Sequence, residues 1–129
     1  MMMPPPVDPP LACVSPFELL RVPAPPAEIG HAYYKFYSFI RPERLRAGWT
    51  RDRIVAALLA QGIPCGTGIC SEIYLEKAFP PELQPSQRLP VARELGETSL
   101  MFLVHPTLTE DDMASMCGVV ESVMSAASE

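Results

Sequence analysis

The sequence is short of the features that would direct it to nucleic acids or membranes. Its 129 residues hold 10 basic side chains against 15 acidic ones, a net charge of −5, so no basic face for nucleic acid or anionic lipid is expected. No apolar run approaches the length needed to span a bilayer. The first residues, Met1 to Pro6, have neither the charged start nor the apolar core of a signal peptide. We therefore expect a cytoplasmic chain with no nucleic-acid or membrane partner.

Groups suited to metal binding or nucleophilic chemistry are also sparse. The two histidines, His31 and His105, stand far apart, and structural or surface roles are expected for both. An even number of cysteines can form disulfides in a secreted protein, but without a signal peptide we expect free thiols. Cys65 and Cys70 have no histidine or second cysteine pair near them, so no metal site is expected. The four cysteines are Cys13, Cys65, Cys70 and Cys117.

Proline is concentrated at the front of the chain, where nine prolines fall within the first 26 residues. Each one removes a backbone donor and fixes φ, so residues 1–27 are expected to form a tail or linker with little regular structure beyond a turn near residues 17–20. Residues 28–129 then form a single domain with room for one core.

Aromatic and β-branched residues dominate residues 31–40, which favours a strand. Alternation along a strand would place Tyr34 and Phe36 on one face and Tyr33 and Tyr37 on the other. Both faces are mostly apolar, so both are expected to be covered.

The next segment predicts a helix that Thr50 caps and Gly62 ends. A short extended piece at residues 63–65, a flexible loop at residues 66–68 and a helical turn within residues 73–79 should follow. The apolar stripe of the helix consists of Ile54, Val55, Leu58 and Leu59.

The last third of the chain predicts helix, strand and helix. Pro90 suits the first position of a helix that ends before Gly96, and residues 100–104 read as a strand covered on both faces. Thr109 and Asp112 are spaced to cap a final helix. Its buried stripe consists of Met113, Met116, Cys117, Val120 and Met124. The fold class predicted is a small α/β (α+β) sandwich, with helices packed on a largely antiparallel sheet.

Several blocks of the sequence resemble one family, the DegT/DnrJ/StrS-type aminotransferases. The blocks are HAYYKFYSFIRPERL at residues 31–45, TRDRIVAALLAQGIPCGTGICSEIYLEKAF at residues 50–79 and LPVARELGETSLMFLVHPTLTEDDM at residues 89–113. They resemble, in the right order, the carboxy-terminal small domain of these enzymes. The resemblance implies a homodimeric enzyme that uses pyridoxal phosphate to aminate a nucleotide-linked keto sugar for polysaccharides or natural products.

The cofactor of that family needs a lysine that forms a Schiff base. Only Lys35 and Lys77 are present, and neither stands in the serine-containing, glycine-followed loop that the family uses. A glycine-rich phosphate cradle at a helix N-terminus is missing too. The chain is therefore expected to have no catalytic residue and no cofactor of its own. Alone it should be inactive, with pyridoxal phosphate bound by an N-terminal catalytic domain of the parent enzyme.

The loop at residues 66–74 corresponds to the loop that faces the active site in the family. Gly68-Ile69-Cys70 stands where many members have His-Tyr-Pro, and Tyr74 replaces a second histidine. The substrate-binding candidates that remain are Ser71, Glu72 and Tyr74, whose polar groups suit sugar hydroxyls, although a solvated turn is the favoured explanation of Glu72. Lys35 is a further candidate, either pointing into the parent's cleft or lying at a sheet edge with its amine exposed.

Three other interpretations remain open from sequence. The dehydratase branch of the family shares this small domain and replaces the cofactor lysine by histidine. A free-standing α/β module could keep a sugar or nucleotide pocket without chemistry. An interaction module could use the apolar surface on which a large domain once packed.

Overall fold

A four-stranded antiparallel sheet forms the centre of the fold. The computed structural model describes residues 18–129, and the strand order is β1-β2-β4-β3. The strands are β1 (Leu20–Arg21), β2 (Lys35–Ile40), β3 (Cys65–Gly66) and β4 (Ser99–Leu103). The longest ladder joins β2 to β4, with Lys35 opposite Leu103 and Phe39 opposite Ser99. The predicted antiparallel sheet is confirmed.

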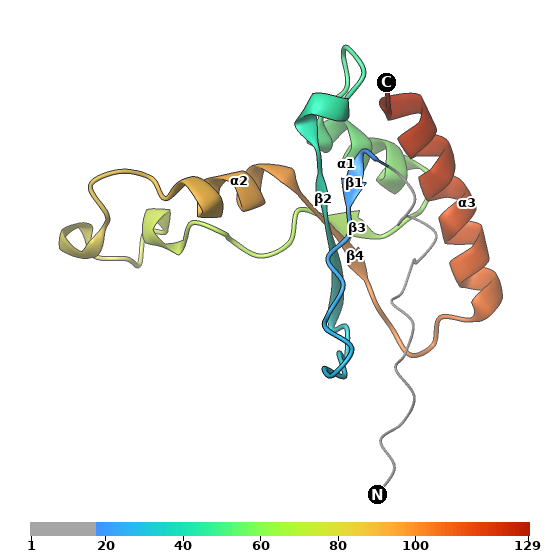
Figure 1. The fold of residues 1–129 in the computed structure, drawn as a ribbon, viewed down its shortest axis with the longest axis horizontal. Helices are drawn as coiled ribbons and strands as arrows, with labels where there is room; N and C mark the ends of the chain where they lie inside the picture. The colour runs from blue at the N-terminus through green and yellow to red at the C-terminus, as the bar shows by residue number, and fades with distance from the viewer. Residues whose placement is uncertain (1–17) are drawn as a thin grey trace, which may run out of the picture.

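Two helices cover one face of this sheet, and the third points away from it. Helix α1 (Arg51–Ala60) and helix α3 (Glu110–Ala127) lie together on one side in Figure 1, whereas α2 (Pro90–Thr98) extends on the other. Three short 3₁₀ helices complete the fold, namely η2 (Pro42–Arg44), η3 (Ile73–Leu75) and η4 (Pro81–Leu83). None of the helices in residues 18–129 is both long and apolar enough to cross a membrane.

The hydrophobic core lies between the sheet and the helix pair α1 and α3. From the sheet it takes Leu20, Phe36, Ile40, Leu100 and Phe102, all at most 3% exposed. From the helices it takes Ile54, Leu58, Met116, Val120, Val123, Met124 and Ala127. The predicted stripe of α3 is confirmed, since Met116, Val120 and Met124 are buried. In α1 the stripe is narrower than predicted, because Leu59 is 52% exposed.

The helix starts agree with their predicted caps. Thr50 Oγ1 accepts from the backbone N–H of Arg53 at 3.0 Å. At α3 a reciprocal capping box forms, in which Thr109 Oγ1 accepts from Asp112 N and Asp112 Oδ2 accepts from Thr109 N. This second pair lowers the pKa of Asp112 through hydrogen bonds to its carboxylate. Helix α2 continues through Gly96 to Thr98, beyond its predicted end.

The strand predicted for residues 31–40 is shortened at its start by Tyr33. This residue has φ +48. That left-handed backbone conformation interrupts an extended strand, and residues other than glycine rarely adopt it. Strand β2 therefore begins at Lys35, and the predicted alternation is wrong before that point: Tyr33 is 8% exposed and Tyr34 is 85% exposed. From Phe36 onward the predicted faces are confirmed.

Two further expectations differ from the structure. Leu20–Arg21 pairs with β2 as a short strand, inside the part for which little regular structure was expected. Cys65 and Cys70 are free thiols, and burial raises the pKa of Cys65. Cys117, in contrast, is disulfide-bonded, so the expectation of free thiols is wrong there. Cys13 lies outside the described residues.

Leu58 and its neighbour Leu59 provide a matched test of this core. Leu58 is fully buried between α1 and the sheet, whereas Leu59 is half exposed. We expect Leu58→Ala to lower the free energy of unfolding by about 2 to 5 kcal/mol, because it removes buried methyl groups and leaves a cavity. Leu59→Ala should change it by about 0.5 kcal/mol or less. Denaturant unfolding of both variants checks this, and equal losses would contradict the placement of α1.

Candidate functional site

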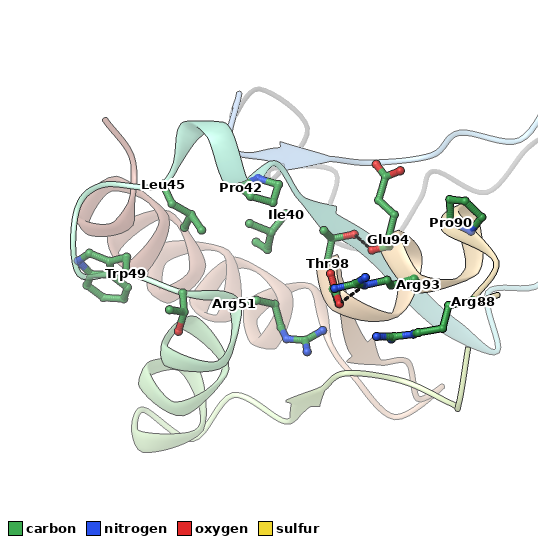
Figure 2. Close-up of a pocket in the computed structure, with 12 residues that line it drawn as sticks. Ile40, Pro42, Leu45, Trp49, Arg51, Arg88, Pro90, Arg93, Glu94 and Thr98 are labelled. Carbon is green, nitrogen blue, oxygen red and sulfur yellow. Dashed lines mark hydrogen bonds and ion pairs between the residues drawn. The ribbon is translucent and has the colours of Figure 1, made fainter. Parts of the chain in front are cut away.

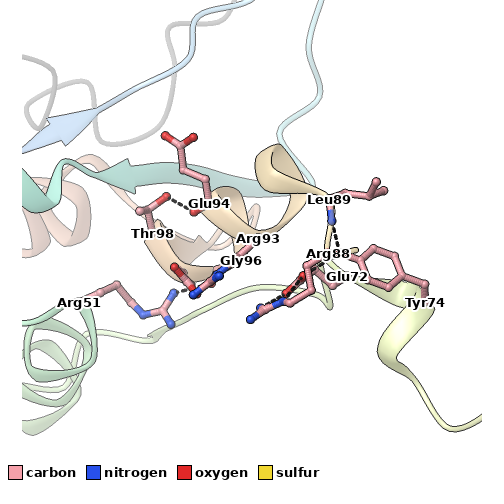
Figure 3. A network of polar contacts seen from close by, with 10 residues as sticks. Arg51, Glu72, Tyr74, Arg88, Leu89, Arg93, Glu94, Gly96 and Thr98 are labelled. Atoms are coloured by element: carbon pink, nitrogen blue, oxygen red, sulfur yellow. Dashed lines mark hydrogen bonds and ion pairs between the residues drawn. The ribbon is translucent and has the colours of Figure 1, made fainter. Parts of the chain in front are cut away.

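Residues 67–98 form an arm that projects from the sheet (Figure 1). The arm contains the loop after β3, then η3, η4 and α2. Two segments of the arm are joined by Glu72. Its carboxylate accepts from both Nε and Nη2 of Arg88, at 2.8 and 2.5 Å, and also accepts from the hydroxyl of Tyr74 at 2.7 Å. Tyr74 Oη in turn accepts from the backbone N–H of Leu89 at 2.9 Å (Figure 3). We call this set the Glu72 clamp.

The carboxylate of the Glu72 clamp is largely shielded from solvent. The side chain of Glu72 is 11% exposed, although that of Arg88 is 45% exposed. The hydrogen bond from Arg88, and then that from Tyr74, lower the pKa of Glu72 to about 2. Burial and the neighbouring carboxylate raise the pKa of Tyr74. Both groups therefore keep the protonation states that suit the clamp at neutral pH.

Arg51 fastens the arm to the body of the fold. Its Nη1 donates to the carbonyl oxygens of Gly96 and Ser99, each at 3.0 Å (Figure 3 draws the first). These carbonyls lie at the C-terminal end of α2, where backbone acceptors lack helical partners. The Nε of Arg51 donates to Asp52 at 2.7 Å, and its side chain is only 17% exposed. A cation from α1 thus caps α2.

A cavity of about 550 Å³ lies where α1, α2 and the end of β2 meet. In Figure 2 the guanidinium groups of Arg51 and Arg88 enter it from opposite sides, and Arg93 lies between them. Glu94 and Glu97 bring negative charge to the same space, and Glu97 pairs with Arg93 at 2.8 Å. No histidine, cysteine or lysine among the described residues lines this cavity. It therefore offers charged hydrogen-bonding groups, while the hydroxyls of Thr50 and Thr98 in its lining are bonded to backbone atoms.

The four predicted substrate-binding residues do not come together at one place. Glu72 and Tyr74 form the clamp, and their polar atoms bond within the protein. Ser71 packs against Gly96 of α2 so closely that a Cβ on Gly96 would overlap its hydroxyl. Lys35 lines a different cavity, of about 510 Å³, beside the start of β2. A role in binding substrate stays a prediction for all four.

Sequence reasoning did not identify the arginines that organise this region. Arg88 and Arg93 lie just before and within α2, and the fold brings Arg51 of α1 to the same cavity. The Thr50 cap and Pro90 marked the starts of two helices, but neither signal indicates that Arg51 will reach the carbonyls at the junction of α2 and β4. Residues 18–129 contain no group of three or more histidine, cysteine or acidic side chains that could hold a metal ion.

Comparisons with known proteins give structural matches only. No family model matches the sequence, and no curated protein matches it. An aminotransferase from Psychrobacter cryohalolentis is 50% identical with a TM-score of 0.71, over 74% of this chain and 25% of that one. A DegT DnrJ EryC1 StrS aminotransferase from Brucella abortus is 24% identical with a TM-score of 0.66, over 85% of this chain and 27% of its own.

A third match is an aminotransferase named TlmJ from Streptoalloteichus hindustanus. It is 23% identical with a TM-score of 0.68, and the match covers 88% of this chain and 28% of that one. The two matches below 25% identity support the fold alone. The chain spans about a quarter of the length of each of these structures.

The lowered pKa of Glu72 predicts how the stability of the fold changes at acid pH. Because the pKa of Glu72 falls from its usual 4.5 to about 2 on folding, its stabilising contribution is complete above about pH 4.5 and is lost as the pH falls toward 2. Glu72→Gln should therefore reduce the loss of thermal stability between pH 6 and pH 2.5. Asp112, with its lowered pKa, should leave the variant some acid dependence.

Glu76→Gln is the matched control, since Glu76 is exposed and forms no ion pair within residues 18–129. That variant should keep the full acid dependence of the parent chain. Melting temperatures measured over the pH range decide the matter, together with an NMR titration of the Glu72 carboxyl. An unchanged acid dependence in Glu72→Gln would show that the clamp does not form.

Proposed function

We propose that this chain is the carboxy-terminal small domain of a DegT-type aminotransferase, since it resembles solved aminotransferases and spans about a quarter of the length of each. The parent would use pyridoxal phosphate to transfer an amino group to a nucleotide-linked keto sugar. The observation that carries this proposal is the 50% identity to an aminotransferase over 74% of the chain. A role in amino-sugar or polysaccharide synthesis and a homodimeric state follow from the same resemblance. These two, and the cytoplasmic location expected from the sequence, stay predictions.

The described residues do not fit pyridoxal phosphate. Lys77 is exposed beside η3, and Lys35 lies on β2, so neither stands at a phosphate cradle. The first helix after Gly66 and Gly68 is η3, which has three residues and is too short to present an array of backbone N–H groups to a phosphate. No step of transamination can be assigned to these residues. The cofactor and its lysine would belong to the rest of the parent enzyme.

Exposed apolar side chains on the arm support a role as a domain that packs on another. An isolated domain would bury most such residues, yet several on the arm are 49% to 76% exposed. They are Ile69, Ile73, Leu75, Leu83, Leu89 and Val91. The Glu72 clamp and Arg51 hold this surface in a fixed position, which is what docking against a catalytic domain requires.

The dehydratase branch remains an alternative because the residues that separate it from the aminotransferases would lie outside this chain. A ligand-binding module without chemistry is favoured by one observation, the cavity beside Lys35. In both alternatives, residues 18–129 contain no lysine that reacts with a cofactor.

Reconstitution with cofactor tests the proposal that the cofactor and its lysine belong to the rest of the parent enzyme. The 129-residue chain mixed with pyridoxal phosphate should show no stable internal aldimine absorption band, because neither lysine lies at a phosphate site. A gene product extended upstream through a lysine-bearing domain should show the band and transaminate nucleotide-linked keto sugars. Lys35→Arg and Lys77→Arg are the controls. A band in the short chain that either variant abolishes would overturn the proposal.

A further inference from the structure

The cavity where α1, α2 and the end of β2 meet has an apolar half and a charged half. In Figure 2, Leu45 and Trp49 lie at one end of it and Arg88 lies at the other. The volume of about 550 Å³ is large enough to hold more than one chemical group. The apolar half consists of Ile40, Pro42, Leu45 and Trp49. A ligand that fills the whole cavity therefore needs both an apolar part and a charged part.

Three guanidinium groups meet in the charged half, and bonds within the protein hold each of them in place. Arg88 donates to Glu72 through Nε and Nη2, and Arg93 donates to Glu97 through Nε alone. Arg51 uses its Nε and Nη1. Within residues 18–129, no acceptor bonds to Nη1 of Arg88, to either Nη of Arg93 or to Nη2 of Arg51. These fixed cations therefore keep N–H donors for an anion that enters the cavity.

Two glutamates line the same cavity without filling the place of an anion. Glu97 is already paired with Arg93 at 2.8 Å. Figure 2 shows the carboxylate of Glu94 pointing away from the three guanidinium groups. With three arginines against two glutamates, the lining has a net positive charge, although the net charge of the whole chain is −5.

Positive charge continues along the chain beside the cavity. Residues 41–53 contain five of the ten basic side chains of the protein and only two acidic ones, and Arg44 and Arg46 in this segment are exposed. The sign of this local charge is opposite to that of the whole chain. An acidic ligand is therefore attracted to this face and repelled by the rest of the surface.

The aromatic side chain of the apolar half is fixed before any ligand arrives. The guanidinium of Arg53 lies 4.2 Å from the centre of the Trp49 ring, and Arg53 Nη1 donates to the carbonyl of Gly48 at 2.7 Å. Trp49 itself is half-buried and lines the cavity. Because the ring is already ordered, a side chain that packs on it loses little binding free energy to ordering the protein.

We propose that this cavity docks an acidic segment of another protein, with an apolar side chain packed on Trp49 and adjacent carboxylates bound by Arg88 and Arg93. Clustered arginines bind acidic motifs through charge-assisted hydrogen bonds, and tryptophan is a common anchor of protein interfaces. An inorganic anion would leave the apolar half empty. A protein segment is favoured over a small organic anion because the positive charge of residues 41–53 extends beyond the cavity. This role goes beyond the proposed aminotransferase function and uses neither its cofactor nor its sugar.

Titration of the full 129-residue chain with a short blocked peptide, in which one leucine lies between aspartates and glutamates, tests this proposal. Trp49 is the only tryptophan of the chain, so its fluorescence reports on the apolar half of the cavity. We expect a saturable change. Replacing the leucine of the peptide by serine, or its acidic residues by their amides, should weaken binding about tenfold, because each change removes half of the recognised chemistry. Inorganic phosphate and phenylpropionate, titrated separately, should bind more weakly than the peptide.

Variants of Arg93 test the charged half. Arg93→Gln should weaken peptide binding about threefold, because an exposed ion pair contributes modestly, and Arg93→Glu about tenfold, because it adds repulsion. The Arg93 side chain is 52% exposed, so both variants should fold, and thermal melts check this. Arg21→Gln is the matched control, since it removes the same charge from an exposed residue outside the cavity. It should bind the peptide as the parent chain does.

Four results would overturn the proposal. They are no fluorescence change at millimolar peptide, unchanged binding in Arg93→Glu, an equal loss in Arg21→Gln, and binding of phosphate or phenylpropionate as tight as that of the peptide. The last result would identify a site for small anions. Peptide binding needs no pyridoxal phosphate, so its failure is distinguishable from failure of the aminotransferase proposal.

Discussion

The antiparallel pairing of β2 with β4 is the constraint on which the rest of the structure depends. It joins residues 60 to 68 positions apart, and the buried hydroxyl of Ser38 reinforces it by donating to the carbonyl of Leu100 at 3.0 Å. Helix α2 runs directly into β4 without a loop, from Thr98 to Ser99, so the direction of the arm follows from this strand. Arg51 then fixes the junction through the Gly96 and Ser99 carbonyls. The position of the arm is therefore a consequence of the central ladder.

Local sequence signals were sufficient wherever the deciding contacts are also local. The Thr50 cap, the Thr109–Asp112 capping box and the 3.6-residue spacing of α3 each act within a few positions, and each forms as predicted. The continuous apolar run of β4 was equally informative, because a strand buried on both faces leaves little choice of residue. Antiparallel order and the position of the core follow from these elements.

Sequence patterns gave wrong or no predictions where a partner distant in sequence, or a single backbone angle, determines the structure. Alternation predicts that Tyr34 is buried with Phe36, but one left-handed residue at Tyr33 shifts the phase by one position. Gly96 suggests a helix end, yet the helix continues because Ser71 and Arg51 pack against that turn. The Glu72 clamp was not predicted for the same reason, since Arg88 lies 16 positions after Glu72 along the chain.

Polar groups in this chain are mostly used to hold it together, and that distribution bears on function. Glu72 and Tyr74, the residues that resemblance placed near a sugar, bond to Arg88 and Leu89 instead of pointing free donors at a ligand. Arg51 bonds to backbone carbonyls. Lys35 differs, because its ammonium forms no ion pair within residues 18–129 and lies 5.5 Å from the centre of the Tyr34 ring. A buried polar group that is already paired gains little from a ligand, since binding would exchange one hydrogen bond for another. Glu72 and Tyr74 therefore hold two segments of the arm together.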